Sequence, residues 1–455
     1  MRNDQRKPHL LSYATFSRRQ LFQVGLGATA AGVLLKSGIA RAATKHSPLG
    51  TFPAGVKSDS IFVGGVMPLT GPYSSSGKDM QLGFELAVKH INEGSAVTEH
   101  IPSLKSHKGL LGKKIKTGVA DSETKPNPAI QAATRFIRDD KAIMLLGGVS
   151  SAVSIALEKL GQREKVIFMV GNSGSNDTTG KDCQRYGFRS QPSAYMCAKA
   201  LAPVLVKEIG RNKKVAYLVP DYTYGHTVFD STSQFTEKDG DWKIATKQLV
   251  PLGTKDFSSY LLNIANSGAD VFINVAFGAD AVLSTKQAKQ FGILEKMKLA
   301  VPNISPFQAK ELGPELMQGV YGTMEFWWGL EDRYPMAKFF VESFEKKYKR
   351  KPRWCAHIGY MQMMIWAAAV EKARSFYPVD VIKSLEKHEW TGTSLGTVRY
   401  DAETHQMIRP VPVVVGKKPS EMRNAEDYYR IAGLVPGKDT MPPSDFFGCK
   451  LGSYS

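Results

Sequence analysis

From residue 58 onward, short apolar runs alternate with longer amphipathic stretches. The short runs are rich in β-branched residues and the longer ones repeat apolar residues at helical spacing, a pattern typical of βα units and a parallel sheet. The first series predicts strands at 61–67, 114–120, 142–146 and 166–170 and helices at 78–92, 128–140, 153–163 and 195–209.

A polar break at residues 210–213 ends this series, and the alternation then starts again. The second series predicts strands at 214–219, 242–250, 271–276 and 298–301 and helices at 225–238, 257–265 and 280–291. Helices at 334–348 and 354–375 follow, and 398–400 and 411–415 are predicted as two late strands in a hairpin. Two similar series predict an α/β fold with two doubly wound, Rossmann-like lobes. Whether residues 419–455 pack on a lobe stays open.

The N-terminus has the three parts of a secretory signal. Arg18 and Arg19 precede an apolar run at 24–35, and Ala40-Arg41-Ala42 supplies an A-x-A cleavage site. The run is much shorter than the roughly 20 residues that span a bilayer, which argues against a membrane anchor. The paired arginines resemble a twin-arginine signal. We therefore expect residues 1–42 to be a twin-arginine-type signal peptide, removed on export to the periplasm.

The net charge of +18 could indicate nucleic acid or an anionic membrane as a partner. Residues 1–42 hold seven Lys and Arg and one acid, however, so their removal leaves +12, and the remaining basic residues are scattered. Export also argues against a nucleic-acid partner. We predict none.

Four cysteines, Cys183, Cys197, Cys355 and Cys449, would meet an oxidising compartment after export. Four cysteines allow three pairings. We favour Cys183–Cys197, since their 14-residue separation suits a staple between a strand, a loop and a helix. No C-x-x-C or H-x-x-x-H spacing is present, so neither a metal site nor a cofactor is predicted.

The strand-to-helix loops are rich in Gly, Ser, Asn and Tyr. In open α/β sheets these loops meet at the carboxyl ends of the strands, where ligands bind. Backbone N–H groups and hydroxyls at helix starts suit a carboxylate or another anionic oxygen, although the same residues also serve as ordinary helix caps and turns. The loops concerned are 68–77, 147–151, 171–177, 221–225, 277–280 and 302–305.

Enzyme motifs mostly fail. Residues 392–396 match G-x-S-x-G, but a nucleophile elbow needs a helix after the serine, and a strand-like segment follows here. The sequence has no P-loop and no histidine pair at ligand spacing. We therefore predict that the protein is not an enzyme.

Five segments together resemble the type I periplasmic binding proteins, in the Leu/Ile/Val-binding branch that serves ABC importers. They are 61–73 (ending Pro-Leu-Thr-Gly-Pro-Tyr), 142–151, Asp221-Tyr-Thr-Tyr-Gly225, Asp256-Phe-Ser258, and 396–401 with His405-Gln406. The resemblance covers about residues 58–418. It implies two lobes joined by three crossovers, with one lobe at 58–210 plus 333–376 and the other at 211–332 plus 377–455.

Position by position, the resemblance implies a set of ligand contacts. They are Ser151, Asn172 and Gly174 from the first lobe and Tyr224, Phe277 and Asn303 from the second, with Ser150 and Tyr73 as neighbours.

One position departs from the family pattern. Amino-acid binders of this branch place an acid where Asn303 stands, to meet the ligand's ammonium. Either Asp221, Asp280 or Glu325 takes that role, or the ligand lacks an ammonium. The expected ligand is therefore a branched-chain amino acid, an amide or a small or aromatic carboxylate.

The resemblance implies a monomeric binding protein that delivers a small molecule to an ABC permease at the inner membrane. Two other readings stay open. A ligand sensor of the same fold could feed a signalling partner, and twin-arginine export, which carries folded cargo, would suit an exported cofactor-dependent enzyme.

Overall fold

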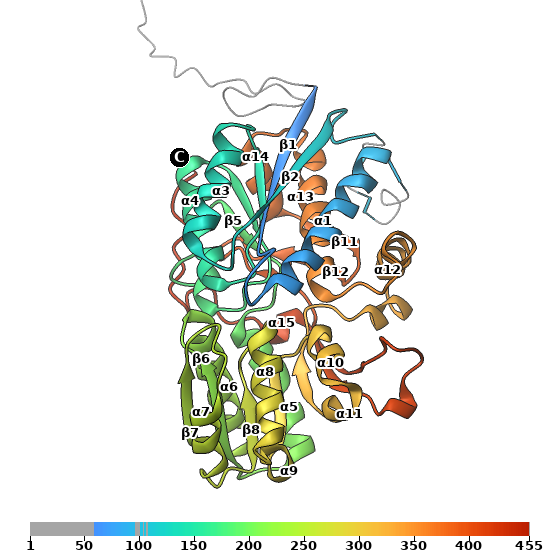
Figure 1. Cartoon of the computed structure of the whole chain (residues 1–455). Helices are drawn as coiled ribbons and strands as arrows, with labels where there is room; N and C mark the ends of the chain where they lie inside the picture. Colours follow the sequence, from blue (N-terminus) through green and yellow to red (C-terminus); the bar gives the residue numbers. More distant parts are fainter. Residues whose placement is uncertain (1–58, 96–100, 103, 106–107, 455) are drawn as a thin grey trace, which may run out of the picture. The chain divides into compact units, whose positions relative to one another are not determined.

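The computed structural model describes residues 59–95, 101–102, 104–105 and 108–454 (Figure 1). The predicted signal peptide, residues 1–42, lies outside the described residues. The described chain forms two main sheets with helices packed on them and a small three-stranded sheet. The predicted α/β class is confirmed.

The first sheet is wholly parallel, with the order β2-β1-β3-β4-β5. Every residue of β3 and β4 is buried, as expected for central strands covered on both faces. The strands are β1 (Ser60–Met67), β2 (Lys114–Asp121), β3 (Met144–Gly147), β4 (Ile167–Val170) and β5 (Gly187–Arg189). The helices between them are α1 (Ser74–Glu93), α3 (Pro126–Arg138) and α4 (Ser151–Glu164), with the short η1 (Asn176–Thr179) after β4.

The second sheet has the order β15-β14-β10-β9-β8-β6-β7. Its strands run parallel from β7 to β10, and β14 and β15 add an antiparallel edge. The strands are β6 (Lys214–Pro220), β7 (Lys243–Val250), β8 (Val271–Asn274), β9 (Lys298–Asn303), β10 (Tyr321–Thr323), β14 (Val411–Gly416) and β15 (Tyr429–Val435). The helices are α5 (Ala194–Ile209), α6 (Thr223–Gly240), α7 (Ser258–Ala265), α8 (Gly278–Gln290), α9 (Ile293–Lys296), α10 (Pro306–Leu312) and α11 (Pro314–Met317).

The longest of the remaining elements is α13 (Trp354–Ala373), which is apolar on all sides and packs along α1. A helix of this pattern belongs in a core, and residues 354–370 are all buried. In the described part of the chain, no helix is both long and apolar enough to cross a membrane. The other elements are α12 (Pro335–Tyr348), α14 (Pro378–Lys387), α15 (Gly437–Thr440), η2 (Trp328–Asp332), η3 (Pro419–Glu421), β11 (Glu389–Thr393), β12 (Gly396–Tyr400) and β13 (Met407–Ile408).

The predicted late hairpin is wrong. Residues 398–400 belong to β12, which pairs with β11 and β13 in the small sheet, whereas β14 pairs with β10 and β15 in the second sheet. The two runs have similar apolar patterns, and apolar pattern does not specify a strand's partner.

The chain passes from one main sheet to the other three times, near residues 190–193, 324–327 and 409–410. Two packing contacts lie across the lobe boundaries that the sequence predicts. The helix α5 packs on β9, β10 and β14 of the second sheet, and α14 packs on α13. The chain therefore changes sheets before residue 210, and α14 stays with the helices of the first sheet.

Candidate ligand-binding site

The residues predicted to contact a ligand come from the carboxyl ends of strands in both main sheets, and all are buried. They lie in loops, in first helical turns or at a strand end, where backbone and side-chain polar groups converge. The first sheet supplies Tyr73, Ser150, Ser151, Asn172 and Gly174, and the second sheet supplies Tyr224, Phe277 and Asn303.

Tyr73 connects the loops of the two sheets. Its hydroxyl lies 2.8 Å from that of Tyr222, and its ring meets Phe277 edge-on, with centroids 5.3 Å apart. Burial raises the pKa of Tyr73, so the hydroxyl stays protonated. Beside it, Gly278 has φ +61°, and a Cβ there would come within 2.8 Å of the Pro72 carbonyl oxygen, so the backbones approach too closely for a side chain.

The serines predicted after β3 lie at the start of α4. Ser150 precedes the helix and makes no side-chain cap bond, whereas the Ser151 hydroxyl accepts the Ser175 N–H at 3.2 Å. The Ser175 hydroxyl in turn lies 2.7 Å from the Thr223 hydroxyl of α6. Hydroxyls thus link the 171–175 loop to both sheets.

Gly174 lies closest to the second sheet's polar groups. A Cβ there would come within 3.0 Å of the Tyr224 ring and 3.1 Å of Asn303 Nδ2. The Tyr224 hydroxyl and Asn303 Oδ1 are both buried and have no hydrogen-bond partner among the described residues. Leaving buried polar atoms unpaired costs free energy, so these two oxygens favour a site where a ligand supplies the missing partners.

Two aromatic residues form an apolar side of this site. Phe277 meets Trp354, the first residue of α13, with ring centroids 5.7 Å apart. The next residue, Cys355, has its sulfur 3.8 Å from Asn172 Nδ2. Neither Trp354 nor Cys355 was predicted as a ligand contact, because the predicted contacts come from strand-to-helix loops and α13 follows a helix, α12.

The three acids that could meet an ammonium have different surroundings. Asp221 is exposed and lies 3.1 Å from His226 Nε2. Asp280 is buried and accepts the Gly253 N–H at 2.7 Å, and burial raises the pKa of its carboxyl. Glu325 pairs with Arg409 in a separate buried cluster.

That cluster joins Glu325, His357, Ser394 and Arg409. His357 Nδ1 lies 2.9 Å from Glu325, and its Nε2 lies 2.6 Å from the Ser394 hydroxyl, which is the connectivity of a Ser–His–acid triad. All four side chains are at most 1% exposed, and Ser394 sits in the turn between β11 and β12, so no substrate reaches them. Because Glu325 and Arg409 lie on two crossovers, we interpret the cluster as structural.

The pKa values in this cluster follow from burial and from the neighbouring charges. Burial lowers the pKa of His357. Burial would raise the pKa of Glu325, but His357 and Arg409 outweigh it and hold that pKa below its usual value. The cluster therefore retains an ionised Glu325–Arg409 pair.

A second buried cation, Arg189, holds the loop that follows β4. Its guanidinium donates to the Ser173 carbonyl oxygen at 3.0 Å, to the Thr179 hydroxyl at 2.5 Å and to Gln406 Oε1 at 2.7 Å, and it also bonds the Ser175 carbonyl. Burial lowers the pKa of Arg189 to about 10, which leaves it cationic at neutral pH. No sequence pattern signals this role, because a single Arg at a strand end is common.

The favoured cysteine pairing is wrong. Cys183 is bonded to Cys449, and Cys197 and Cys355 are free and buried. The first crossover intervenes between Cys183 and Cys197, and it carries Cys197 into α5 on the second sheet. The C-terminal segment instead returns to the first sheet beside Cys183.

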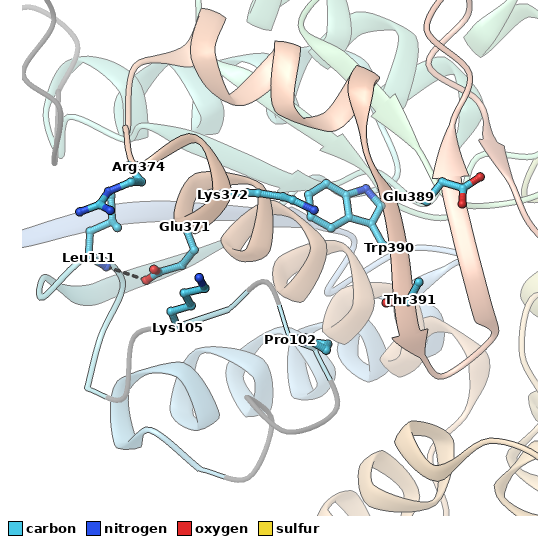
Figure 2. Close-up of a pocket in the computed structure, with 9 residues that line it drawn as sticks. All are labelled: Pro102, Lys105, Leu111, Glu371, Lys372, Arg374, Glu389, Trp390 and Thr391. Atoms are coloured by element: carbon cyan, nitrogen blue, oxygen red, sulfur yellow. Dashed lines mark hydrogen bonds between the residues drawn. The ribbon is translucent and has the colours of Figure 1, made fainter.

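A separate cavity of about 540 Å³ lies where the end of α13 meets β11 (Figure 2). Its lining mixes charges of both signs: the Lys372 ammonium lies 5.6 Å from the Trp390 ring centroid, and Glu371 accepts the Leu111 N–H at 3.0 Å. None of the predicted ligand contacts lines it. The lining residues are Pro102, Lys105, Leu111, Glu371, Lys372, Arg374, Glu389, Trp390 and Thr391.

Comparison with known proteins gives one consistent answer. The family model described as "Periplasmic binding protein" matches residues 60–420. The chain is 25% identical over 339 residues to Leu/Ile/Val-binding protein homolog 7 of Brucella abortus (strain 2308), covering 72% of this chain and 81% of that protein.

Two solved structures have similar folds. The amino acid ABC transporter substrate-binding protein from Pseudomonas fluorescens Pf-5 aligns with a TM-score of 0.76 at 23% identity, covering 87% of this chain and all of that one. A solute-binding protein of an ABC transporter from Rhodopseudomonas palustris BisB5, in complex with 3,4-dihydroxybenzoic acid, aligns with a TM-score of 0.71 at 20% identity, covering 83% and 97%. These relatives are binding proteins and not enzymes.

Proposed function

Because the chain belongs to the periplasmic binding protein family, we propose that it is the substrate-binding component of an ABC importer and captures a small organic solute between the loops of its two sheets. The solute binds first to the 150–151 and 171–174 loops. Hinge closure then brings Tyr224 and Phe277 over it, so ligand binding and the form that docks on the permease share one conformational equilibrium.

One observation carries this proposal. The Tyr224 hydroxyl and Asn303 Oδ1 are buried beside Gly174 without hydrogen-bond partners among the described residues. Other buried atoms of the described residues, such as the Tyr217 hydroxyl, also lack a partner, but these two lie beside a predicted ligand contact, where a ligand can complete them. The eight predicted contacts therefore form one ligand site, to which Trp354 adds an apolar wall.

The surroundings of the acids support a ligand that carries a carboxylate but no ammonium. Asp221 is exposed and Glu325 is already paired with Arg409. Asp280 is buried, and its carboxylate already accepts the Gly253 N–H at 2.7 Å. Backbone N–H groups of the loops and nearby hydroxyls remain to bind an anionic oxygen. The bound 3,4-dihydroxybenzoic acid of the relative from R. palustris shows that this fold accommodates such a ligand.

The proposal also includes where the protein acts, with which partners, and how its chain divides into lobes. We infer export to the periplasm through the twin-arginine signal at residues 1–42, action as a monomer beside an inner-membrane ABC permease, and no nucleic-acid partner. From the packing of α5 and α14 we also propose revised lobes, at about 59–190 plus 328–408 and about 191–327 plus 409–440.

A thermal-shift screen of the mature chain, stripped of bound ligand, tests the proposal. The panel contains leucine, valine, small amides, short carboxylates and benzoates. At 100 times Kd a ligand adds about 2.7 kcal/mol to the free energy of unfolding, which is a measurable shift. We expect a carboxylate to raise the melting temperature. No shift with any compound would overturn the solute-binding assignment.

A further inference from the structure

The C-terminal strap, residues 441–454, connects the two main sheets in addition to the three crossovers. It leaves the second sheet after β15 and α15. Gly437 of α15 packs so tightly on the third crossover that a Cβ there would come within 2.4 Å of the Arg409 nitrogen. α15 also packs on α5, which lies on the second sheet. The strap therefore starts from a fixed point beside the second sheet.

The middle of the strap crosses the first crossover through aromatic contacts. Phe446 and Phe447 lie against the Tyr195 ring of α5, with centroids 5.4 and 5.6 Å apart. Phe447 also abuts Gly180, where a Cβ would come within 2.7 Å of the Phe447 Cβ. One short segment thus touches α5 on the second sheet and the loop that follows β4 on the first.

The end of the strap is bound to the first sheet's side of the molecule. Cys449 forms the disulfide with Cys183. The Leu451 carbonyl accepts the Arg185 N–H at 3.1 Å. Tyr454 donates its hydroxyl to Glu386 at 2.6 Å and stacks under the Arg185 guanidinium at 4.7 Å.

The disulfide lies close along the chain to the predicted ligand contacts. Cys183 donates its N–H to the Gly180 carbonyl at 2.9 Å, and the Asp182 N–H bonds the Asp177 carbonyl at 3.0 Å. The preceding residues carry the ligand loop, whose carbonyls Arg189 holds at Ser173 and Ser175. A hydrogen-bonded segment therefore links Cys183 to the loop that carries Asn172 and Gly174.

We propose that the strap, anchored by Cys183–Cys449, is a positioning device that holds the 171–183 segment in its ligand-binding conformation and slows solute release. The effect on solute release rests on the proposed function, whereas the effect on the conformation of the 171–183 segment does not. A disulfide that only stabilised the folded state would leave the local opening of this segment unchanged relative to the rest of the molecule.

Hydrogen exchange on the full mature chain tests the conformational part without any ligand. Cys449→Ser removes the disulfide, and Cys197→Ser is the matched control, because it removes a buried free thiol and leaves the strap intact. We expect Cys449→Ser to raise exchange at 171–183 at least tenfold more than at the β8 strand (271–274), where any increase reports only the loss of global stability. Equal rates in wild type and Cys449→Ser, or a uniform increase across both segments, would overturn the proposal.

A second variant keeps the test decisive if Cys449→Ser folds poorly. Phe447→Ala retains the disulfide but removes the ring contact with Tyr195. We expect a roughly threefold rise in exchange at 171–183 only. No change in this variant, alongside poor folding of Cys449→Ser, would assign the disulfide to global stability alone.

The binding part uses leucine and 3,4-dihydroxybenzoate as probes. We expect a probe that binds to dissociate from the Cys449→Ser variant at least threefold faster than from the Cys197→Ser variant. Equal dissociation rates would overturn the link to solute release. If neither these probes nor the thermal-shift panel binds wild type, the proposed function fails while the exchange result still decides the conformational claim. The two failures are therefore distinguishable.

Discussion

Two buried polar regions of this protein differ in how their hydrogen-bonding groups are satisfied. In the cluster at the crossovers, Glu325 accepts from both His357 and Arg409, and His357 also bonds Ser394. In the candidate site, the Tyr224 hydroxyl and Asn303 Oδ1 have no partner within the described residues. Burial without a partner is costly, so the first region is complete in itself, whereas the second leaves two oxygens that the proposed ligand would pair.

The largest effect on stability is expected at the crossover cluster. Glu325→Gln would leave the Arg409 guanidinium buried without a countercharge, and we expect a loss of about 3–5 kcal/mol in the free energy of unfolding. Urea denaturation measures this loss. Asp221→Asn is the matched control, since its pair with His226 is exposed and worth at most about 1 kcal/mol. Equal, small losses in both variants would contradict a structural role for the cluster.

The next largest effect is expected at the disulfide. Breaking a cross-link that closes a loop of 266 residues releases chain entropy in the unfolded state, so Cys449→Ser should lower stability by about 2–5 kcal/mol. Chemical denaturation under non-reducing conditions is the measurement. An unchanged denaturation midpoint would show that the Cys183–Cys449 bond does not form in solution.

In the candidate site, in contrast to the crossover cluster, removal of a polar group should not destabilise the protein. Tyr224→Phe removes a buried hydroxyl that lacks a partner, so the stability of the ligand-free protein should hold or rise by up to about 1 kcal/mol. Affinity for the solute should fall roughly tenfold, equivalent to about 1.4 kcal/mol. Paired denaturation and titration calorimetry separate the two effects. A variant that loses stability but keeps its affinity would place Tyr224 in the core and not in the site.

The smallest effect concerns acidification of the crossover cluster. The pKa of His357 is lowered in the folded state, so between the ordinary histidine pKa of about 6.5 and the lowered value the unfolded chain binds the proton that the folded chain refuses. Stability is therefore complete above that range and falls as pH drops through it, by at most about 1.4 kcal/mol per pH unit. The lowered pKa of Glu325 adds a further loss at lower pH.

His357→Gln isolates that contribution, because His90 and His405, which also have lowered pKa values, remain in both proteins. Urea denaturation of wild type and variant at pH 7 and pH 5 should show a smaller acid-induced loss in the variant. An identical loss in both proteins would mean that His357 does not contribute.

Much of the fold could be predicted because strands and helices have strong periodic patterns. The continuous apolar runs of β3 and β4 and the repeated βα order predicted the parallel strands of both main sheets. Helix starts were predicted less well: α6 begins at Thr223, so Tyr224 lies in a helical turn and not in the loop before it. Polar first turns weaken the apolar signal that periodicity depends on.

The site was predicted as a set of residues but not as a network. The sequence pointed to strand-to-helix loops, whereas Trp354 starts a helix that follows another helix and Arg189 acts from a strand end. The Cys183–Cys449 pair joins residues 266 positions apart, and the pairing of cysteines cannot be read from spacing. Interactions between distant segments depend on topology, which local patterns do not specify.

The central claim is that the site accepts a carboxylate and has no partner for an ammonium. Titration calorimetry of the stripped mature chain with two matched pairs tests it most directly: leucine against 4-methylpentanoate, and phenylalanine against 3-phenylpropanoate. Each pair differs only in the ammonium group. At least one ammonium-free carboxylate should bind at least tenfold more tightly than its amino acid, and Asn303→Asp should narrow or reverse that preference. Tighter binding of the amino acid in both pairs would contradict the account.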